Sequence, residues 1–317
     1  MRVTLSRFLL ASILLLCLGV TAVVAGPPPE YQFRIGGSCA FVNGKVITVG
    51  GRYYGNFVDA AGKEYRTDEG TAGVGIFNPT TNEWSSAKFD GTGPMGYDGD
   101  GNGICDWNSD WAKAGIWTQT NQAVSYNGKL YLVAGFSKPD GPIWCFDPSA
   151  GTRGTWSLVA TNPTDWAHFR RGAVGLYGTK IFMGAGSSGG KFGSYDISTG
   201  TWALYAGGAP NVDRCGATVC NGKFYIVGGW DRTTDTASPT IYACDLSNPN
   251  AGFTAVATLP VTVVSPMVTS YNGKVYVIAG ATVEDIPGDP RVINYTATNI
   301  VQSYDPATGQ VHNMTAE

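Results

Sequence analysis

The chain has 317 residues, a formal net charge of −3 and charged side chains at only 14% of its positions. This charge balance gives no basic footprint for nucleic acid, so we expect no nucleic-acid partner. The 44 glycines, with few long helix-period patterns, favour an all-β protein of many short strands joined by tight turns.

Residues 1–25 are predicted to be a signal peptide. Arg2 and Arg7 give a basic start, residues 8–24 are nearly all apolar, and Val23-Val-Ala25 is a small-residue cleavage site. The alternative is a membrane anchor, because the apolar stretch is about long enough to span a bilayer. No second stretch of that length follows. We therefore expect a secreted, extracellular chain with no membrane span after cleavage.

Five copies of one pattern follow within residues 26–317. Each copy turns through Asn-Gly-Lys or a near relative, continues with a β-branched or aromatic run and closes on glycine. The copies begin at Asn43, Asn127, Gly178, Asn221 and Asn272. Asn-Gly supplies the two positive-φ residues of a two-residue hairpin turn, so each copy predicts a pair of antiparallel strands.

Each copy also predicts a third and a fourth strand. The third ends in an aromatic residue beside a polar turn, as in Phe146-Asp-Pro148, although repeat four has Cys244 there. An indole opens the fourth strand in three copies, at Trp84, Trp156 and Trp202. We expect these repeated aromatic residues to form the core, because each can bury roughly 150–250 Å² of surface.

This pattern resembles the kelch repeat family, in which each repeat forms one four-stranded blade of a β-propeller. The resemblance covers about residues 36–315 and implies blades at roughly 36–90, 120–160, 170–207, 213–259 and 264–315, with an insertion at 88–118. One blade cannot bury both faces of its sheet, so blades must stack around a ring. Five copies are fewer than is usual in the family. A closed five-bladed ring and part of a larger propeller are both open interpretations.

Six cysteines remain after signal cleavage: Cys39, Cys105, Cys145, Cys215, Cys220 and Cys244. An even number in a secreted protein predicts disulfides, with the pairing left open, and free buried thiols are the alternative. Asn294-Tyr-Thr296 and Asn313-Met-Thr315 are predicted N-glycosylation sites.

The insertion at 88–118 is the least repeat-like segment and carries two candidate sites. Asp98, Asp100, Asn102 and Asp106 offer the oxygen ligands that calcium prefers, although a flexible polar loop explains them as well. No other cofactor is expected. Trp107 and Trp111 can stack on sugars or anchor a partner protein, or they pack the insertion onto the propeller.

A third candidate site is predicted near the central channel. Arg171 and Arg214 each stand seven positions before a repeat start, and the kelch resemblance places this position at the entry of the innermost strand. Two guanidinium groups there can hold a ligand carboxylate bidentately, or they bridge carbonyl groups and acids between blades. Trp230 and Arg232 follow the second-strand glycines of repeat four and join the same rim.

No catalytic constellation is evident, since the chain contains no phosphate loop or His-Glu-x-x-His motif. We therefore predict a secreted kelch-repeat propeller that acts as a scaffold binding an extracellular protein or a glycan. The alternative is an enzyme with a pocket at the central channel. Resemblance suggests either a sugar-acid mutarotase, using Arg171, Arg214 and Glu284 or Asp285, or a galactose-oxidase-like enzyme. A galactose-oxidase-like copper site needs two histidine ligands. The chain has two histidines, His168 and His312, and they lie in different repeats.

Overall fold

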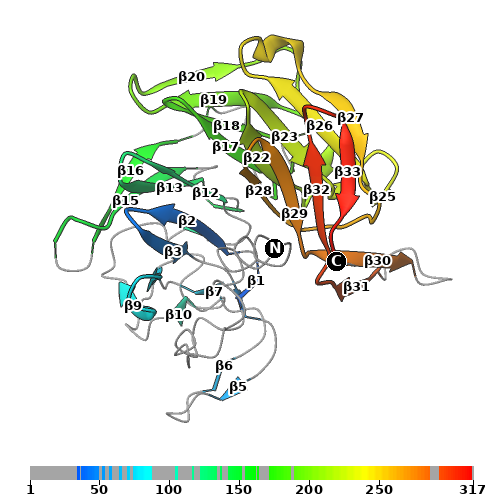
Figure 1. The fold of residues 1–317 in the computed structure, drawn as a ribbon. Helices are drawn as coiled ribbons and strands as arrows, with labels where there is room; N and C mark the ends of the chain where they lie inside the picture. Colours follow the sequence, from blue (N-terminus) through cyan, green and yellow to red (C-terminus); the bar gives the residue numbers. More distant parts are fainter. Residues whose placement is uncertain are drawn as a thin grey trace, which may run out of the picture.

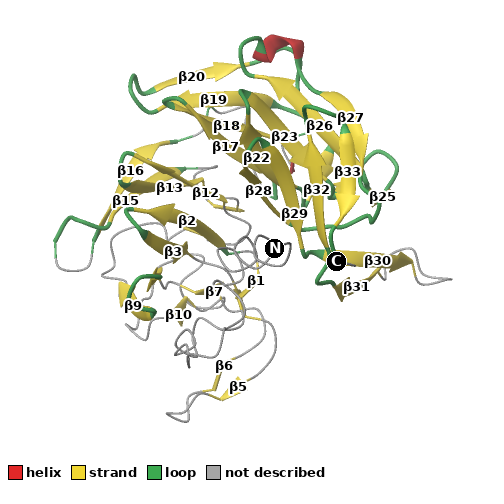
Figure 2. Ribbon diagram, in the orientation of Figure 1, coloured by secondary structure: helices red, strands yellow, loops and turns green. Residues whose placement is uncertain are grey.

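The computed structural model describes residues 34–35, 37–49, 52–53, 57–58, 64–65, 70–71, 74–87, 104–105, 116–117, 122–133, 136–137, 142–151, 154–161, 163, 171–186, 189–285 and 293–315. Strands dominate this part of the chain, and η4 (Pro249–Ala251) is a single 3-10 turn, red in Figure 2. Within these ranges no helix is long and apolar enough to cross a bilayer. The predicted signal peptide at 1–25 lies outside the described residues.

Among the described residues, five of the six four-stranded sheets form antiparallel blades in chain order, which confirms the predicted all-β propeller of about five blades. Blade one contains β2 (Ser38–Val42), β3 (Lys45–Val49), β8 (Val74–Asn78) and β9 (Glu83–Ala87). Blade two contains β12 (Gln122–Tyr126), β13 (Lys129–Val133), β15 (Ile143–Asp147) and β16 (Thr155–Ala160). Blade three contains β17 (Ala173–Tyr177), β18 (Lys180–Gly184), β19 (Phe192–Asp196) and β20 (Thr201–Leu204). Blade four contains β22 (Gly216–Cys220), β23 (Lys223–Val227), β26 (Thr240–Asp245) and β27 (Thr254–Thr258), and blade five contains β28 (Met267–Tyr271), β29 (Lys274–Ile278), β32 (Val301–Asp305) and β33 (Gln310–Asn313).

Shorter strands form small sheets in the connections. One sheet joins β1 (Arg34–Ile35), β4 (Arg52–Tyr53), β7 (Gly70–Thr71) and β10 (Ile104–Cys105). Two further antiparallel pairs are β5 (Phe57–Val58) with β6 (Glu64–Tyr65) and β11 (Ile116–Trp117) with β14 (Phe136–Ser137). A three-stranded sheet joins β21 (Val212–Asp213), β24 (Trp230–Asp231) and β25 (Thr236–Ala237), and β30 (Ala281–Asp285) pairs with β31 (Ile293–Ala297).

The first strands of the blades lie innermost, and the blades are arranged around them from blue to red in Figure 1. Strand β2 contacts β12, β12 contacts β17, β17 contacts β22, and β22 contacts β28. Among the described residues, no contact of this extent joins β28 to β2. Neighbouring blades are thus in contact along their inner strands.

The Asn-Gly turns have the predicted geometry and also connect blades. Asn43 and Gly44 have φ of 49° and 78°, as a tight hairpin turn between β2 and β3 requires. The Asn43 side-chain amide donates to the carbonyl of Gly128 in the next turn (3.2 Å). Asn221 donates in the same way to Gly273 (3.3 Å). The asparagine therefore both shapes its own hairpin and holds the neighbouring blade.

The hydrophobic core lies between successive blades, in four clusters. The first two clusters join blade one to two and blade two to three, through residues such as Ile47 with Leu132 and Tyr131 with Met183. The others join blade three to four and blade four to five, through residues such as Phe192 with Phe224. Burying each large side chain stabilises the fold by roughly 1.5–3 kcal/mol, so each blade depends on its neighbours.

The repeated aromatic pairs pack inside the blades as predicted. Phe77 faces Trp84, Phe146 faces Trp156, and Tyr195 faces Trp202, with ring centroids 5.1, 5.0 and 5.1 Å apart. Each pair joins the third strand to the fourth in register. In blade five Val311 stands opposite Tyr304, so the loss of an indole there leaves the strand pairing intact.

An aspartate closes the turn after the third strand. Asp147 accepts hydrogen bonds from the hydroxyl and amide of Ser149 (2.6 and 2.9 Å), and it forms an ion pair with Lys129 (3.0 Å). These hydrogen bonds, that of Ser149 foremost, lower the pKa of Asp147 to about 2. Asp196 and Asp245 make the same bonds to serines two positions later. The lysine of the Asn-Gly-Lys turn and this aspartate are thus parts of one structural repeat.

The disulfide prediction is corrected for four cysteines, because Cys145, Cys215, Cys220 and Cys244 are buried free thiols. They pack in three different inter-blade clusters, where a thiol behaves as a small hydrophobic group. Burial raises the pKa of Cys215 to about 12 and that of Cys244 to about 11, so both stay protonated. Cys39 is exposed in β2, and the side chain of Cys105 lies outside the described residues.

Candidate functional site

One edge of the propeller gathers the start of each first strand and the end of each second strand, because the two strands are antiparallel. The Asn-Gly turns lie at the opposite edge. Loops that follow the second strands, including β24–β25 in blade four and β30–β31 in blade five, therefore leave from the edge at which the chain enters the inner strands. Residues from both kinds of segment can meet there.

The entry to the inner strand has the same backbone conformation in three blades. Arg171, Arg214 and Ser265 precede β17, β22 and β28 by the same interval and have φ of 58°, 51° and 52°. The Arg214 amide donates to the Arg171 carbonyl (3.0 Å), and the Ser265 amide donates to the Arg214 carbonyl (2.6 Å). Arg171 and Arg214 thus occupy equivalent places, held by direct hydrogen bonds between blades.

Three arginines surround one carboxylate at this edge, and we call Arg171, Arg214 and Arg232 the arginine cluster. Arg232 Nη1 lies 2.8 Å from Asp213 Oδ2, and Arg214 Nη1 lies 3.3 Å from Asp213 Oδ1. Arg171 Nη1 is 3.9 Å from Oδ2, an ion-pair distance rather than a hydrogen bond. The Asp213 side chain is 0% exposed, whereas those of Arg171, Arg214 and Arg232 are 26%, 26% and 50% exposed.

The β24–β25 hairpin carries Arg232 to the cluster. Strand β24 pairs with β21, so Trp230 stands opposite Asp213, and the Arg232 amide donates to the Asn211 carbonyl (3.0 Å). Trp230 is only 5% exposed, and its indole nitrogen donates to Asp235 Oδ1 (2.8 Å). The ring of Trp230, predicted to face a ligand, therefore lies in the interior and supports the hairpin instead.

Gly229 allows the chain that follows the second strand of blade four to pass close to Asp213. Gly229 has φ of 95°, and a Cβ added there would lie 2.5 Å from the Asp213 carbonyl oxygen. Any side chain at this position would push β24 away from β21. The closing glycine of the repeat is thus required here by close backbone approach as well as by its dihedral angle.

Tyr295 of β31 reaches the cluster from blade five. The Cζ atom of Arg214 lies 5.9 Å from the centroid of the Tyr295 ring, within the range of a cation–π contact. The Tyr295 side chain is 47% exposed. The arginine cluster itself comes from blades three and four, and Tyr295 adds a contact from blade five.

The electrostatics of the cluster favour an anion. Among these four side chains three guanidinium groups face one buried carboxylate, so the four together carry a net positive charge. A guanidinium has five N–H donors, whereas a carboxylate offers about four lone-pair sites, so Asp213 cannot satisfy all the donors of Arg214 and Arg232. The arrangement can hold a second carboxylate or a similar anion.

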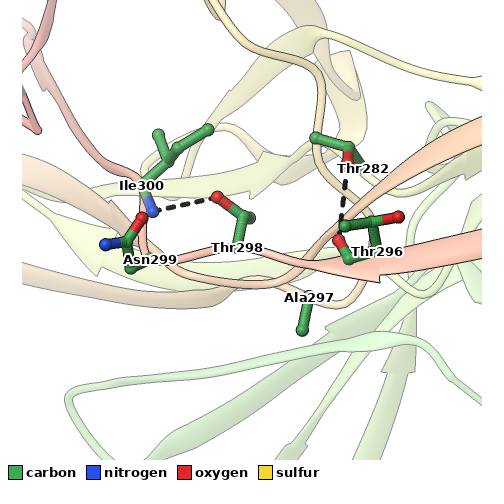
Figure 3. A pocket seen from close by; sticks show the side chains of 6 residues that line it. All are labelled: Thr282, Thr296, Ala297, Thr298, Asn299 and Ile300. Atoms are coloured by element: carbon green, nitrogen blue, oxygen red, sulfur yellow. Dashed lines mark hydrogen bonds between the residues drawn. The ribbon is translucent and has the colours of Figure 1, made fainter.

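A shallow cavity of about 560 Å³ lies next to the β30–β31 hairpin (Figure 3). It is lined by Thr282, Thr296, Ala297, Thr298, Asn299 and Ile300. The Thr282 hydroxyl donates to the Thr296 carbonyl, and the Thr298 hydroxyl accepts from the Ile300 amide. Its lining has hydroxyl and amide groups but no charged side chain, so it does not match the chemistry of the arginine cluster.

Several predicted site residues lie outside the described residues: Trp107, Trp111, Asp98, Asp100, Asn102, Asp106 and His168. The backbones of Glu284, Asp285 and Asn294 are described in β30 and β31, but their side chains are not. Asn313 is exposed in β33, and its Oδ1 accepts from the Thr315 amide (3.1 Å). In the described ranges no three His, Cys, Asp or Glu side chains group as metal ligands.

Sequence reasoning missed two members of the site, Asp213 and Tyr295. Asp213 stands where repeat five has Val264, and a carboxylate directly before the entry residue Arg214 was the available signal. Tyr295 lies within a glycosylation sequon, which drew attention to Asn294 alone. Both come from the strand entries and variable loops, where binding residues usually lie on a rigid scaffold.

Comparison with known proteins supports the kelch resemblance. Residues 213–243 match the family model of the kelch motif. Kelch-like protein 35 of Mus musculus is 33% identical over 115 residues, which are 35% of this chain and 19% of the mouse protein. The match thus spans about a fifth of the length of that curated relative.

A solved structure shows the same fold. The structure titled "Structure of YjhT" superposes with a TM-score of 0.59 and 16% identity, over 88% of this chain and 83% of that chain. At this identity the likeness concerns the fold alone. Together with the five blade sheets, it shows a β-propeller, and the match to the kelch motif lies in blade four.

Proposed function

We propose that this kelch-type β-propeller is a secreted binding scaffold, and that it binds carboxylate-bearing extracellular proteins or glycans at the arginine cluster. The observation that carries the proposal is the convergence of three guanidinium groups from two blades on the single buried carboxylate of Asp213. The kelch-type fold supports a protein-binding scaffold more generally, since its loops leave a rigid ring.

Preorganisation is the physical basis of the proposed binding. Arg214 and Arg232 are held by Asp213 at 3.3 and 2.8 Å, so little side-chain entropy remains to be lost when a ligand binds. Their side chains are nevertheless 26% and 50% exposed and can be reached from solvent. A ligand carboxylate would be bound by charge-assisted hydrogen bonds, which are about twice as strong as neutral ones.

A sugar-acid mutarotase is the second candidate, favoured by the same approach of Arg171 and Arg214 to a carboxylate. Asp213 itself is fully buried and bonded to arginines, so it is poorly placed to exchange protons with a ligand. The mutarotase would need Glu284 or Asp285 as its acid or base. We therefore place binding ahead of catalysis.

The binding proposal is tested with the single substitutions Arg171→Gln, Arg214→Gln and Arg232→Gln. Each should weaken binding to sialylated or uronic-acid glycans on an array by about 10-fold or more, because each removes a charged donor. Lys223→Gln, an exposed change in the Asn-Gly-Lys turn at the opposite edge, is the matched control. Unchanged binding by all three arginine variants would refute the proposal. Conversion of one sugar-acid anomer to the other, abolished by Glu284→Gln or Asp285→Asn, would favour the enzyme.

Secretion, glycosylation and calcium binding are proposed on the sequence alone. Expression of the full chain in a eukaryotic host should give protein in the medium, shortened at residue 25. Its mass should fall on enzymatic deglycosylation, and Asn294→Gln and Asn313→Gln should remove this shift. Calcium should bind the purified protein and be lost after Asp98→Ala and Asp100→Ala. Intracellular retention with an intact N-terminus would contradict secretion.

A further inference from the structure

The side chain of Tyr295 stands beside the arginine cluster without being part of its charge network. Its ring centroid lies 5.9 Å from Arg214 Cζ, and the side chain is 47% exposed. Strand β31 positions it by pairing with β30, where Val283 stands opposite. An aromatic ring therefore forms one wall next to Arg214.

The guanidinium of Arg214 leaves one edge for a ligand. Its Nη1 faces Asp213 Oδ1 at 3.3 Å. Among the described residues, no other acceptor is hydrogen-bonded to this guanidinium. A carboxylate takes a guanidinium in its plane through two parallel hydrogen bonds, so the edge formed by Nε and Nη2 is the place for a second carboxylate.

The distances bring a bound ligand next to the tyrosine. In a bidentate pair the carboxylate carbon lies about 4 Å from Cζ, given N–H···O distances of roughly 2.7–2.9 Å. The group attached to that carbon and the ring of Tyr295 are then both within about 6 Å of the same Cζ atom. A ring carried by the ligand can then lie against the Tyr295 side chain, which is 47% exposed.

We propose that Tyr295 is the specificity-determining residue of the arginine cluster, and that it selects carboxylates carried directly on a ring over simple carboxylates. This inference rests on the proposed function, because it takes the arginine cluster as a carboxylate site. The arginines recognise the charge, and Tyr295 recognises the body of the ligand. A ringless acid meets only the arginines.

The probes are glucuronate, which has both features, acetate, which lacks the ring, and glucose, which lacks the charge. Calorimetric titration should show that glucuronate binds more tightly than acetate and that glucose does not bind. Tyr295→Ala should weaken glucuronate binding about 3- to 10-fold, as expected for loss of one aromatic contact, and leave acetate binding unchanged. Tyr295→Phe should retain the wild-type preference because it keeps the ring.

The control is Tyr271→Ala, a change to another exposed tyrosine (51% exposed) at the Asn-Gly edge of blade five, which should change neither affinity. An equal loss for glucuronate and acetate in Tyr295→Ala would overturn the inference, since Tyr295 would then only hold Arg214 in place. Wild-type glucuronate affinity in Tyr295→Ala, with binding still lost in Arg214→Gln, would also overturn it but leave the carboxylate site intact. Failure of Arg214→Gln to affect glucuronate binding would overturn the inference, and the proposed function would fall with it if Arg171→Gln and Arg232→Gln also left binding unchanged. No binding of either acid would overturn both proposals.

Discussion

Replacing Asp213 by asparagine tests whether the arginine cluster depends on one buried negative charge. Asparagine keeps the shape and one acceptor oxygen, but it removes the negative charge that the three guanidinium groups share at this position. Removing one partner of a fully buried ion pair costs about 3–5 kcal/mol. An exposed pair contributes only about 0–1 kcal/mol.

The expected cost lies between these limits because the partners differ in exposure. Asp213 is 0% exposed, Arg171 and Arg214 are 26% exposed, and Arg232 is 50% exposed and can be rehydrated easily. After this discount we expect Asp213→Asn to lower the free energy of unfolding by about 2–3 kcal/mol. With a denaturant slope of about 2–3 kcal/mol per molar urea, the unfolding midpoint should fall by about 1 M.

Urea unfolding followed by tryptophan fluorescence measures this shift, and Asp235→Asn is the control. Asp235 accepts a hydrogen bond from Trp230 but makes no described ion pair with the arginine cluster, so its change should cost less. A double-mutant cycle adds Arg232→Gln, which should cost less in the Asp213→Asn background than in the wild type. A midpoint for Asp213→Asn equal to that of the wild type, with strictly additive effects of Arg232→Gln, would refute the reasoning.

Three further predictions follow from the described contacts. Gly229→Ala should lower the free energy of unfolding by about 2–4 kcal/mol, because its Cβ would lie 2.5 Å from the Asp213 carbonyl oxygen. The control Gly44→Ala, whose Cβ would have nothing within 4 Å, should lower it by only about 1–2 kcal/mol. Equal unfolding midpoints of the two variants would contradict this prediction. Cys145, Cys215, Cys220 and Cys244 should resist a thiol reagent in the native protein and react fully in urea without reductant, whereas resistance in urea would indicate disulfides. The lowered pKa values of Asp147, Asp196, Asp245 and Asp305 give stability that is fully present above their usual 3.8 and lost as pH falls, for Asp147 towards about 2. The melting temperature should therefore drop between pH 4 and pH 2, and a drop that is unchanged in Asp147→Asn would exclude that residue as a contributor.

The repeat was predictable because its signals are local. Asn43-Gly44 determines a hairpin from two adjacent dihedral angles, and the pairing of Phe146 with Trp156 spans only neighbouring strands of one blade. The entry positions of Arg171 and Arg214 could be aligned for the same reason, since each lies at a constant offset from its turn. Local geometry repeated in phase therefore specifies the blades.

The site and the cysteines depended on contacts that no local pattern encodes. Arg232 meets Asp213 through the pairing of β24 with β21, and Tyr295 reaches Arg214 from a different blade. The even number of cysteines suggested disulfides, but Cys145 and Cys220 were placed by packing in separate clusters rather than by pairing. Counting residues cannot distinguish these two causes of burial.

Two hydrogen bonds that recur between blades use different surfaces of each blade. The asparagine of the turn donates to the following blade, as Asn221 does to Gly273, and the amide at the strand entry donates to the preceding blade, as Ser265 does to Arg214. Contact of this kind is heterologous, since the two surfaces that meet are different. The chemistry of such an interface does not limit how many units can follow one another. Duplicating or deleting one repeat unit in the gene would again place these two kinds of surface opposite each other. The rotation between neighbouring blades therefore sets the number of blades. That number can change in evolution while the interface between blades stays the same.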